Sequence, residues 1–288
     1  MLRVLVHIQR NLDRDLSLEE LARIACFSPY HFHRIFRGMT GETLAVHIRR
    51  IRLERAALRL ATTRRAILDI ALEAGYESHE AFTRAFGAMT GLSPSRFRER
   101  RRLVSENGTA RVRFDPEGGA EDFQPIDTGG SNMDARMETI GPLRVAFVRH
   151  TGPYDECGKA WGTLCAVLGP KGLLGPDTRF LGLCHDDPEV TPPEKIRYDA
   201  CAVVDERFQP EGEVGAQVLP EGEYAMALHR GPYSGLAAAY AELCGQWVAR
   251  QGREVASAPS LEFYRNDPNT TAPEDLLTEI CVPLEPAE

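Results

Sequence analysis

The chain has 288 residues, 43% of them hydrophobic, and a formal net charge of −8. Its length favours two domains, and it contains no apolar run of 18 residues, which excludes a hydrophobic membrane-spanning helix. The stretch 1–15 is charged and lacks the apolar core of a signal peptide. The seven cysteines form no Cys-x-x-Cys pair. We therefore expect a reduced, cytoplasmic protein with no membrane partner.

The net charge hides an asymmetry along the chain. Residues 1–113 contain 21 arginines, no lysine and 12 acidic residues, a charge of +9, whereas the remainder carries −17. A basic domain can attract a polyanion that an acidic domain would repel. An arginine-rich helical domain without a nucleic-acid partner would show the same composition, so the motifs must decide between the two.

The basic part repeats itself with a shift of fifty residues. The sequence FRGMTG at 36–41 returns as FGAMTG at 86–91. Apolar residues at helical spacing precede each copy, Ser28 and Ser78 suit helix N-caps, and a glycine suited to a helix end closes each copy. Each copy is therefore predicted to be a helix, a tight turn and a second helix.

The second helix of such a unit can enter the major groove of DNA. Its apolar face should pack inward, which leaves the polar residues of the opposite face to read bases. Arginine can bond guanine and glutamate can accept from cytosine, whereas histidine and threonine are less selective. The candidate readers are Tyr30, His31, His33, Arg34 and Arg37 in the first unit, and His79, Glu80, Thr83 and Arg84 in the second.

Residues 43–61 lie between the two units and contain neither glycine nor proline. They predict a helix of about 28 Å, whereas successive major-groove faces on one side of DNA lie about 34 Å apart. A stiff connector of this length could hold two recognition helices near that spacing. Its arginines could contact phosphates, although some should be solvated or salt-bridged; they are Arg49, Arg50, Arg52, Arg55 and Arg59.

Residues 5–102 resemble the DNA-binding domain of AraC/XylS-type transcription regulators. The likeness is most specific in DIALEAGYESHEAFTRAFGAMTGLSPSRFR, residues 69–98. The resemblance implies an all-α domain, which we place at 1–104, with seven helices and two helix-turn-helix units on one connecting helix. One departure is Glu80, which places an acidic side chain among the candidate readers of the second unit. The base that this unit prefers is therefore open.

Residues 105–133 are rich in Gly, Asp, Glu and Pro and lack helical periodicity. They predict a linker, in which ARVRF at 110–114 could pair as a short strand. The acidic part, 134–288, repeats with a shift near eighty, so that 145–168 matches 224–248 and 181–204 matches 261–284. Two pseudo-symmetric strand-helix-strand-strand repeats are expected, an α+β domain with a ligand groove between its halves.

The motifs RHTGPY, LEFYRNDP and TEICVPL of this part resemble the GyrI-like small-molecule-binding domain over residues 134–285. The resemblance implies a domain that binds drug-like, often cationic, aromatic compounds. Joined to an AraC-type domain, it implies the sensor of a regulator.

Two strands carry the charges that such a groove would use. Glu262 and Tyr264 alternate in one strand and so share a face, as do Glu279 and Cys281 in the last strand. A carboxylate in an aromatic-walled groove costs free energy unless a cation or hydrogen bonds satisfy it. The candidate ligand contacts are Glu262, Tyr264, Glu279, Tyr154, Trp161 and Tyr233, with Tyr240 and Trp247 as further candidate walls. His150 and His229 are expected to bond backbone instead.

These patterns predict a DNA-binding transcription regulator whose acidic domain senses a small, cationic or aromatic ligand. Its expected partners are double-stranded DNA, the effector and, as a further partner, RNA polymerase; we expect no catalytic residue, no metal and no cofactor. Two alternatives stay open for the acidic domain. In a hydrolase of reactive small molecules, Glu262 or Glu279 would position water or act as a base. The second alternative is a module that sequesters a protein partner. Neither alternative explains residues 1–102.

Overall fold

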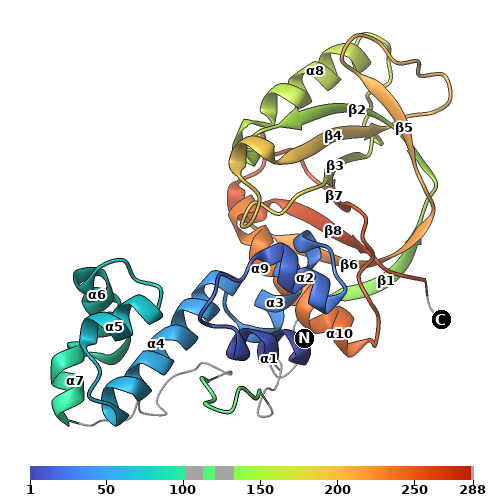
Figure 1. The fold of residues 1–288 in the computed structure, drawn as a ribbon. Helices are drawn as coiled ribbons and strands as arrows, with labels where there is room; N and C mark the ends of the chain where they lie inside the picture. Colours follow the sequence, from blue (N-terminus) through green and yellow to red (C-terminus); the bar gives the residue numbers. More distant parts are fainter. Residues whose placement is uncertain (101–112, 121–132, 287–288) are drawn as a thin grey trace. The chain divides into compact units, whose positions relative to one another are not determined.

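The computed structural model describes residues 1–100, 113–120 and 133–286, which belong to two compact units, Met1–Ile126 and Asp127–Glu288 (Figure 1). Most of the expected linker at 105–133 lies outside the described residues, and so does most of the strand expected at 110–114. Within the described ranges, no helix combines the length and the apolar character needed to cross a membrane.

The first unit is all-α, as its sequence predicts. Its described helices are α1 (Leu2–Arg10), α2 (Leu18–Ala25), α3 (Pro29–Thr40), α4 (Leu44–Thr62), α5 (Ile67–Glu73), α6 (His79–Thr90) and α7 (Pro94–Arg100). The pairs α2–α3 and α5–α6 are the two helix-turn-helix units, and α4 is the connecting helix. The expected seven helices are therefore confirmed.

The same local signals set the limits of both recognition helices, α3 and α6. Ser28 and Ser78 each accept, through Oγ, the backbone N–H three residues further on, at 3.4 and 3.1 Å. Gly41 and Gly91 follow the helices with φ of 81° and 72°, a left-handed conformation that glycine adopts without steric cost. The two copies thus begin and end alike because their capping residues are the same.

Each helix-turn-helix unit has its own apolar core. Phe32 and Phe36 are fully buried among α1, α2 and the start of α4. Phe82, Phe86 and Phe97 are buried among α5, α6, α7 and the end of α4. Because α4 contributes side chains to both cores, it joins the two units as one continuous helix.

The second unit is α+β and contains an eight-stranded antiparallel sheet, seen as a curled layer in Figure 1. The strands follow the order β1-β6-β8-β7-β3-β4-β2-β5. Their bounds are β1 (Ala135–Ile140), β2 (Leu143–Thr151), β3 (Phe180–Cys184), β4 (Arg197–Val203), β5 (Gly215–Leu219), β6 (Gly222–Arg230), β7 (Ser260–Tyr264) and β8 (Leu277–Pro283).

The strand order shows that the two sequence repeats are related by a pseudo-twofold axis. One half consists of β1–β4 with α8 (Gly158–Leu168), and the other of β5–β8 with α9 (Leu236–Glu242), a π-helical turn Leu243–Trp247 and α10 (Val248–Arg250). Exchanging the halves reproduces the order read from the other end, so the axis passes between β3 and β7. Each half gives its first strand to the other half, because β1 pairs with β6 and β5 pairs with β2.

Each face of the sheet carries an apolar core of its own. On one face, Ala146, Ala200 and Ala202 present small side chains against which α8 packs with Ala160 and Leu164. The opposite face carries a second core that includes large side chains of the central strands, such as Leu181, Leu261 and Phe263. Residues of one strand therefore alternate between two distinct environments, and the strand register decides which residues can meet.

Replacing Ser78 with alanine removes the acceptor that caps α6. We expect Ser78→Ala to lower the free energy of unfolding of the helical unit by about 1 kcal/mol, and Ser78→Asp, which keeps an acceptor, to retain most of it. Urea unfolding followed by far-ultraviolet circular dichroism measures the difference. Equal stability of Ser78→Ala and the wild type would contradict the role of this cap.

Candidate functional site

The predicted readers of the first unit all lie on α3. The guanidinium of Arg34 lies 4.3 Å from the ring centroid of Tyr30, which also meets the ring of His31 edge-on at 4.6 Å. His33 and Arg37 lie on the same helix. The Arg34–Tyr30 contact is a cation–π arrangement, which orients the guanidinium relative to the helix.

The predicted readers of the second unit lie on α6, where Phe82 and Phe86 turn inward and are fully buried. Three readers are exposed, namely His79, Glu80 and Arg84, and Thr83 is half-buried. Polar residues thus occupy the exposed side of this helix, as the sequence predicts, and the base preferences of the individual side chains stay predictions.

The arginines of α4 are mostly used within the helical unit rather than left for phosphates. Arg50 pairs with Glu42 and Glu54, and Arg55 pairs with Asp13 at 2.7 Å. Arg52 donates to backbone carbonyls before α2, and Arg59 pairs with Glu73. Arg49 is exposed. Four of the five arginines of α4 thus have partners within the helical unit, as expected for some of them, and phosphate contacts along α4 stay a prediction.

The second unit contains a buried carboxylate at its pseudo-twofold axis. Glu262 of β7 is 7% exposed and lies directly opposite Gly182 of β3. Tyr240 of α9 donates its O–H to Oε1 at 3.0 Å, and Tyr264 donates to Oε2 at 3.0 Å. Among the described residues, neither oxygen forms an ion pair with a basic side chain. Both oxygens are hydrogen-bonded, but the negative charge has no counter-charge beside it.

Aromatic rings surround this carboxylate. Tyr264 is at their centre, with ring centroids 5.7 Å from Trp161 and 5.9 Å from Tyr233, both edge-on. Its hydroxyl lies 2.9 Å from that of Tyr198. Because Tyr264 gives its proton to Glu262, Tyr198 is the donor of that bond. Tyr198 in turn meets the ring of Tyr154 edge-on at 5.6 Å.

The phenols of this cluster stay neutral and able to donate. Burial raises the pKa of Tyr198 and Tyr264 well above the ordinary value for tyrosine, and the charge of Glu262 acts in the same direction. Burial and then the charge of Glu262 also raise the pKa of Tyr233. The site therefore combines one negative charge with neutral aromatic walls.

Four aromatic residues of the site occupy positions that match in the two repeats, whereas the carboxylate and the other two aromatic residues occupy positions that differ between them. Tyr154 and Tyr233 occupy matching positions in the two Gly-Pro-Tyr motifs, and Trp161 matches Tyr240 on the following helices. In contrast, Glu262 matches Gly182, Tyr264 matches Cys184 and Tyr198 matches Thr278. Both halves thus contribute to a site that has only one carboxylate.

Gly182 makes room for the phenols that hold Glu262. A Cβ at this position would lie 2.5 Å from Cε2 of Tyr198 and 2.7 Å from the hydroxyl oxygen of Tyr264. Any larger residue would therefore displace one of these rings. The glycine is required here by a close approach rather than by its backbone conformation.

Glu279, which we expected in the same groove, lies on the opposite face of the sheet. It pairs in register with Phe263, the residue between Glu262 and Tyr264. Arg136 donates to its Oε1 at 2.7 Å, and Arg265 pairs with its other oxygen. Burial would raise the pKa of Glu279, but these two arginines hold it below its ordinary value. Glu279 therefore does not share a face with Glu262 and Tyr264.

The sequence also singled out Trp247 and the two histidines that precede Gly-Pro-Tyr. Trp247 is not among the rings that contact the cluster. His150 and His229 bond the carbonyl oxygens of Pro153 and Pro232 at 2.9 and 3.1 Å, in agreement with the expected backbone role. Tyr198 was missed, although its mismatch with Thr278 in the repeat is a signal that could have found it.

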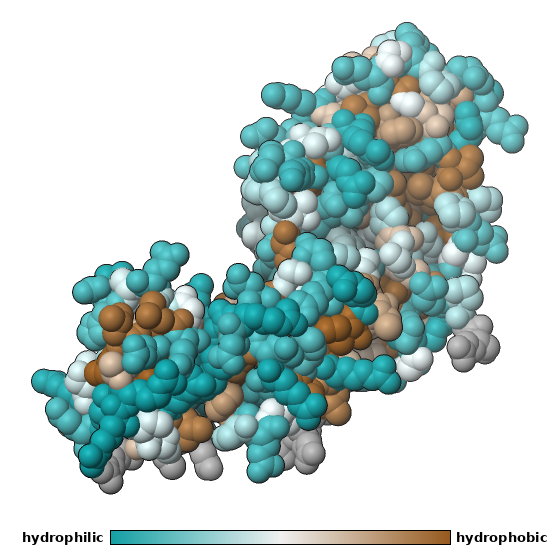
Figure 2. Space-filling view, in the orientation of Figure 1, coloured by the Kyte–Doolittle hydropathy of each residue, from teal (hydrophilic) through white to brown (hydrophobic). Residues whose placement is uncertain are grey.

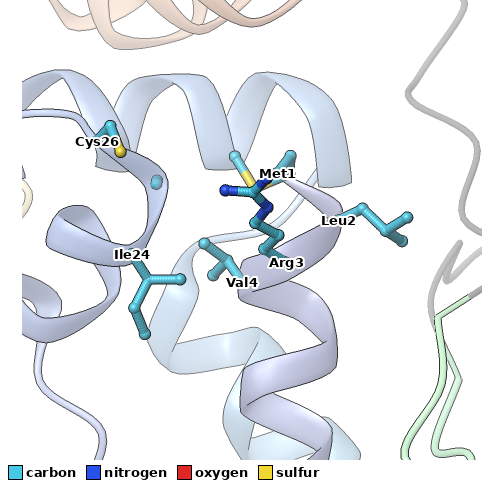
Figure 3. A pocket seen from close by; sticks show the side chains of 7 residues that line it. Met1, Leu2, Arg3, Val4, Ile24 and Cys26 are labelled. Carbon is cyan, nitrogen blue, oxygen red and sulfur yellow. The ribbon is translucent and has the colours of Figure 1, made fainter.

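Other surface features lie apart from these residues. A hollow of about 390 Å³ lies between the start of α1 and the end of α2. Figure 3 shows its lining, which includes Met1, Arg3 and Ile24. On α5, Leu68 and Leu72 are about half exposed, and Figure 2 shows hydrophobic residues gathered over α5 and α6. Neither feature includes a predicted reader or a residue of the aromatic cluster.

Comparison with known families agrees with both units. The model of the GyrI-like small molecule binding domain matches residues 133–285, just over half of the chain. The chain belongs to this GyrI-like family. A second family model, a helix-turn-helix domain, matches residues 21–100. The GyrI-like chain thus carries its DNA-binding module ahead of the family domain.

Curated relatives match the helical unit. The chain is 41% identical over 95 residues to the transposon Tn10 TetD protein of Escherichia coli, which covers 33% of this chain and 69% of that protein. It is 39% identical over 95 residues to the transcriptional activator AarP of Providencia stuartii, covering 33% and 70%. These matches make the first unit an AraC-type domain and the chain an AraC-type DNA-binding transcription regulator with a GyrI-like domain.

Solved structures resemble the chain more loosely. The EcmrR–DNA complex from a transcription open complex has a TM-score of 0.47 and 23% identity, over 54% of this chain and 58% of that one. The C-terminal domain of EcmrR has a TM-score of 0.45 and 22% identity, over 55% of this chain and all of that one. Likeness at this level carries no functional argument.

Replacing Gly182 with alanine should disturb the carboxylate site directly. We expect Gly182→Ala to displace Tyr198 or Tyr264 and to lower the free energy of unfolding by about 1–3 kcal/mol through overpacking. Gly162→Ala on α8, where an added Cβ meets nothing within 4 Å, is the matched control and should not destabilise. Chemical denaturation of the full chain measures both, and an unchanged stability of Gly182→Ala would refute the close approach.

Proposed function

We propose that the GyrI-like domain is the sensor of this regulator and that Glu262 binds a lipophilic, aromatic organic cation. One observation carries the proposal: Glu262 is a buried carboxylate enclosed by aromatic rings, and no basic side chain among the described residues pairs with it. Because the same chain contains a DNA-binding domain, binding of the cation can be transmitted to transcription.

The energetics of the site favour a cation. A buried carboxylate without a counter-charge costs free energy, which two phenol hydrogen bonds offset only in part. A cation beside Glu262 would remove the remaining cost. Contacts between that cation and faces of the surrounding rings would add about 0.5–2 kcal/mol each.

The hydrogen bonds of the site indicate which cations fit. Both oxygens of Glu262 already accept an O–H, from Tyr240 and Tyr264. A ligand therefore needs charge and ring surface more than hydrogen-bond donors. Entry requires a ring to move, and Tyr233, which is 42% exposed on a short 3₁₀ turn, is the most accessible of them.

We further propose that α3 and α6 read neighbouring major-groove segments with the residues predicted from the sequence. In this mechanism a ligand at Glu262 changes either the affinity of the regulator for DNA or its contact with RNA polymerase. The proposal requires only that the ligand bind two states of the protein with different affinity.

Binding of a cation is tested with tetraphenylphosphonium as the probe and tetraphenylborate, an anion of the same shape, as its control. At a hundred times its dissociation constant, the cation should raise the Tm of the wild-type domain by roughly 5–10 °C, and the anion should not. Glu262→Gln should lose most of the shift, because the carboxylate supplies the charge, whereas Glu274→Gln, an exposed carboxylate of the same domain, should keep it.

Equal shifts with the cation and the anion, or a full shift in Glu262→Gln, would contradict the proposed site. Chemical turnover of a bound compound by the wild type, lost in Glu262→Gln, would favour the hydrolase alternative instead.

DNA recognition is tested with a duplex selected by the protein from a random pool. If roughly 6–8 phosphates are contacted, log K should fall by about 5–7 for each log unit of salt. Arg84→Ala should cost about 1–3 kcal/mol if this side chain bonds a base, and Arg207→Ala, in the other unit, should cost nothing. Affinity that is independent of salt would overturn the assignment of the helical unit.

A further inference from the structure

Residues 113–120 follow the second helix-turn-helix unit in the chain but contact the first one. Glu54 of α4 accepts the backbone N–H of Phe114 at 2.8 Å and pairs with Nη1 of Arg113 at 3.1 Å. Gln9 of α1 donates to the carbonyl oxygen of Arg113 at 2.5 Å. Glu54 and Gln9 are 7% and 6% exposed, so this segment completes the hydrogen bonds of two buried polar side chains.

The segment is also packed and internally ordered. Phe114 and Ala120 join the apolar core of α1, α2 and α3. The carboxylate of Asp115 accepts the backbone N–H groups of Glu117 and Gly119, each at 2.8 Å, which closes a tight turn. Residues 113–120 therefore form a built element of the first unit, which we call the strap.

The strap is linked to the end of recognition helix α3. Its partner Glu54 also pairs with Arg50, and Arg50 pairs with Glu42, which lies two residues after the end of α3. Burial would raise the pKa of Glu42, but the hydrogen bonds from His47 and Arg50 hold it at about 2, so this carboxylate stays charged at neutral pH. The position that matches Glu42 in the second unit is Leu92. The second unit thus lacks the carboxylate that begins this chain of ion pairs.

The strap also determines how far the sensor domain can reach from the first unit. Fourteen residues separate Ala120 from β1, the first strand of that domain, and they span at most about 50 Å. Without the strap the connection runs from the end of α7 through 34 residues, which span at most about 120 Å. Docking therefore shortens the reach more than twofold and moves the attachment point from the second unit to the first.

We propose that residues 113–120 are a releasable strap that attaches the sensor domain to the first helix-turn-helix unit and so makes that unit the one that responds to the ligand. The described contacts of the strap include the Glu54 and Gln9 bonds and two apolar side chains, of which Phe114 is only half-buried. The docking itself is independent of the sensing function proposed above; only the response to a ligand rests on it.

Hydrogen exchange of the full chain, without DNA or ligand, tests the docking. The amides of Phe114 and Gly119 should be protected in the wild type because both are bonded to side-chain oxygens. Phe114→Ala should reduce this protection at least tenfold and leave that of α1 and α4 unchanged, whereas Phe114→Leu should keep most of it. Arg23→Ala, an exposed residue of α2, is the control.

Small-angle scattering of the same variants tests the attachment point. Release of the strap in Phe114→Ala should increase the radius of gyration by several ångström, and Phe114→Leu should not. Unprotected strap amides in the wild type, or a radius of gyration that is the same in all variants, would overturn the proposal.

The response is tested by the DNA affinity measured with and without tetraphenylphosphonium. The ratio of the two affinities should approach one in Phe114→Ala, while the affinity without ligand stays within a few-fold of the wild type. A full ligand effect in this variant would overturn the role of the strap in the response. Failure of the wild type to bind the cation at all would count against the sensing function alone, since exchange and scattering decide the docking without it.

Discussion

The charge of Glu262 is the constraint around which the C-terminal domain is arranged, because this carboxylate is buried and has no basic partner in the described part of the chain. Its oxygens need donors, which Tyr240 and Tyr264 supply from a helix and from the same strand. Those phenols need space, which Gly182 provides from the opposing strand. The aromatic shell in turn requires helices from both halves of the repeat. The strand exchange between the halves stabilises this arrangement because neither half has a complete sheet alone.

In the helical unit, ion pairs serve the fold more than the sequence suggests. Four of the five arginines on α4 bind carboxylates or carbonyl oxygens of neighbouring segments. This use of charge keeps α4 fixed against both helix-turn-helix units, which a rigid spacing of two recognition helices needs.

The sequence predicted the elements well and their long-range partners poorly. The fifty-residue repeat and its caps at Ser28 and Ser78 are local signals, so the two helix-turn-helix units followed from them. Alternation showed that Glu279 and Cys281 share a face, but only the pairing of β7 with β8 shows that this face is the one opposite Glu262. The contact of Tyr198 with Tyr264 and that of Phe114 with Glu54 likewise join residues that are 66 and 60 positions apart in the sequence.

The position of the pseudo-twofold axis has a consequence for the origin of the site. In an assembly of two identical half-chains, the residue at the position of Glu262 would face its own copy across the axis, since Glu262 and Gly182 are direct partners in the β3–β7 ladder. Two glutamates there would repel each other, and two glycines would leave the axis without this carboxylate. A single polypeptide that joins both halves escapes this choice, because each copy of the position can mutate separately. Joining both halves in one chain therefore permits a single carboxylate at the axis.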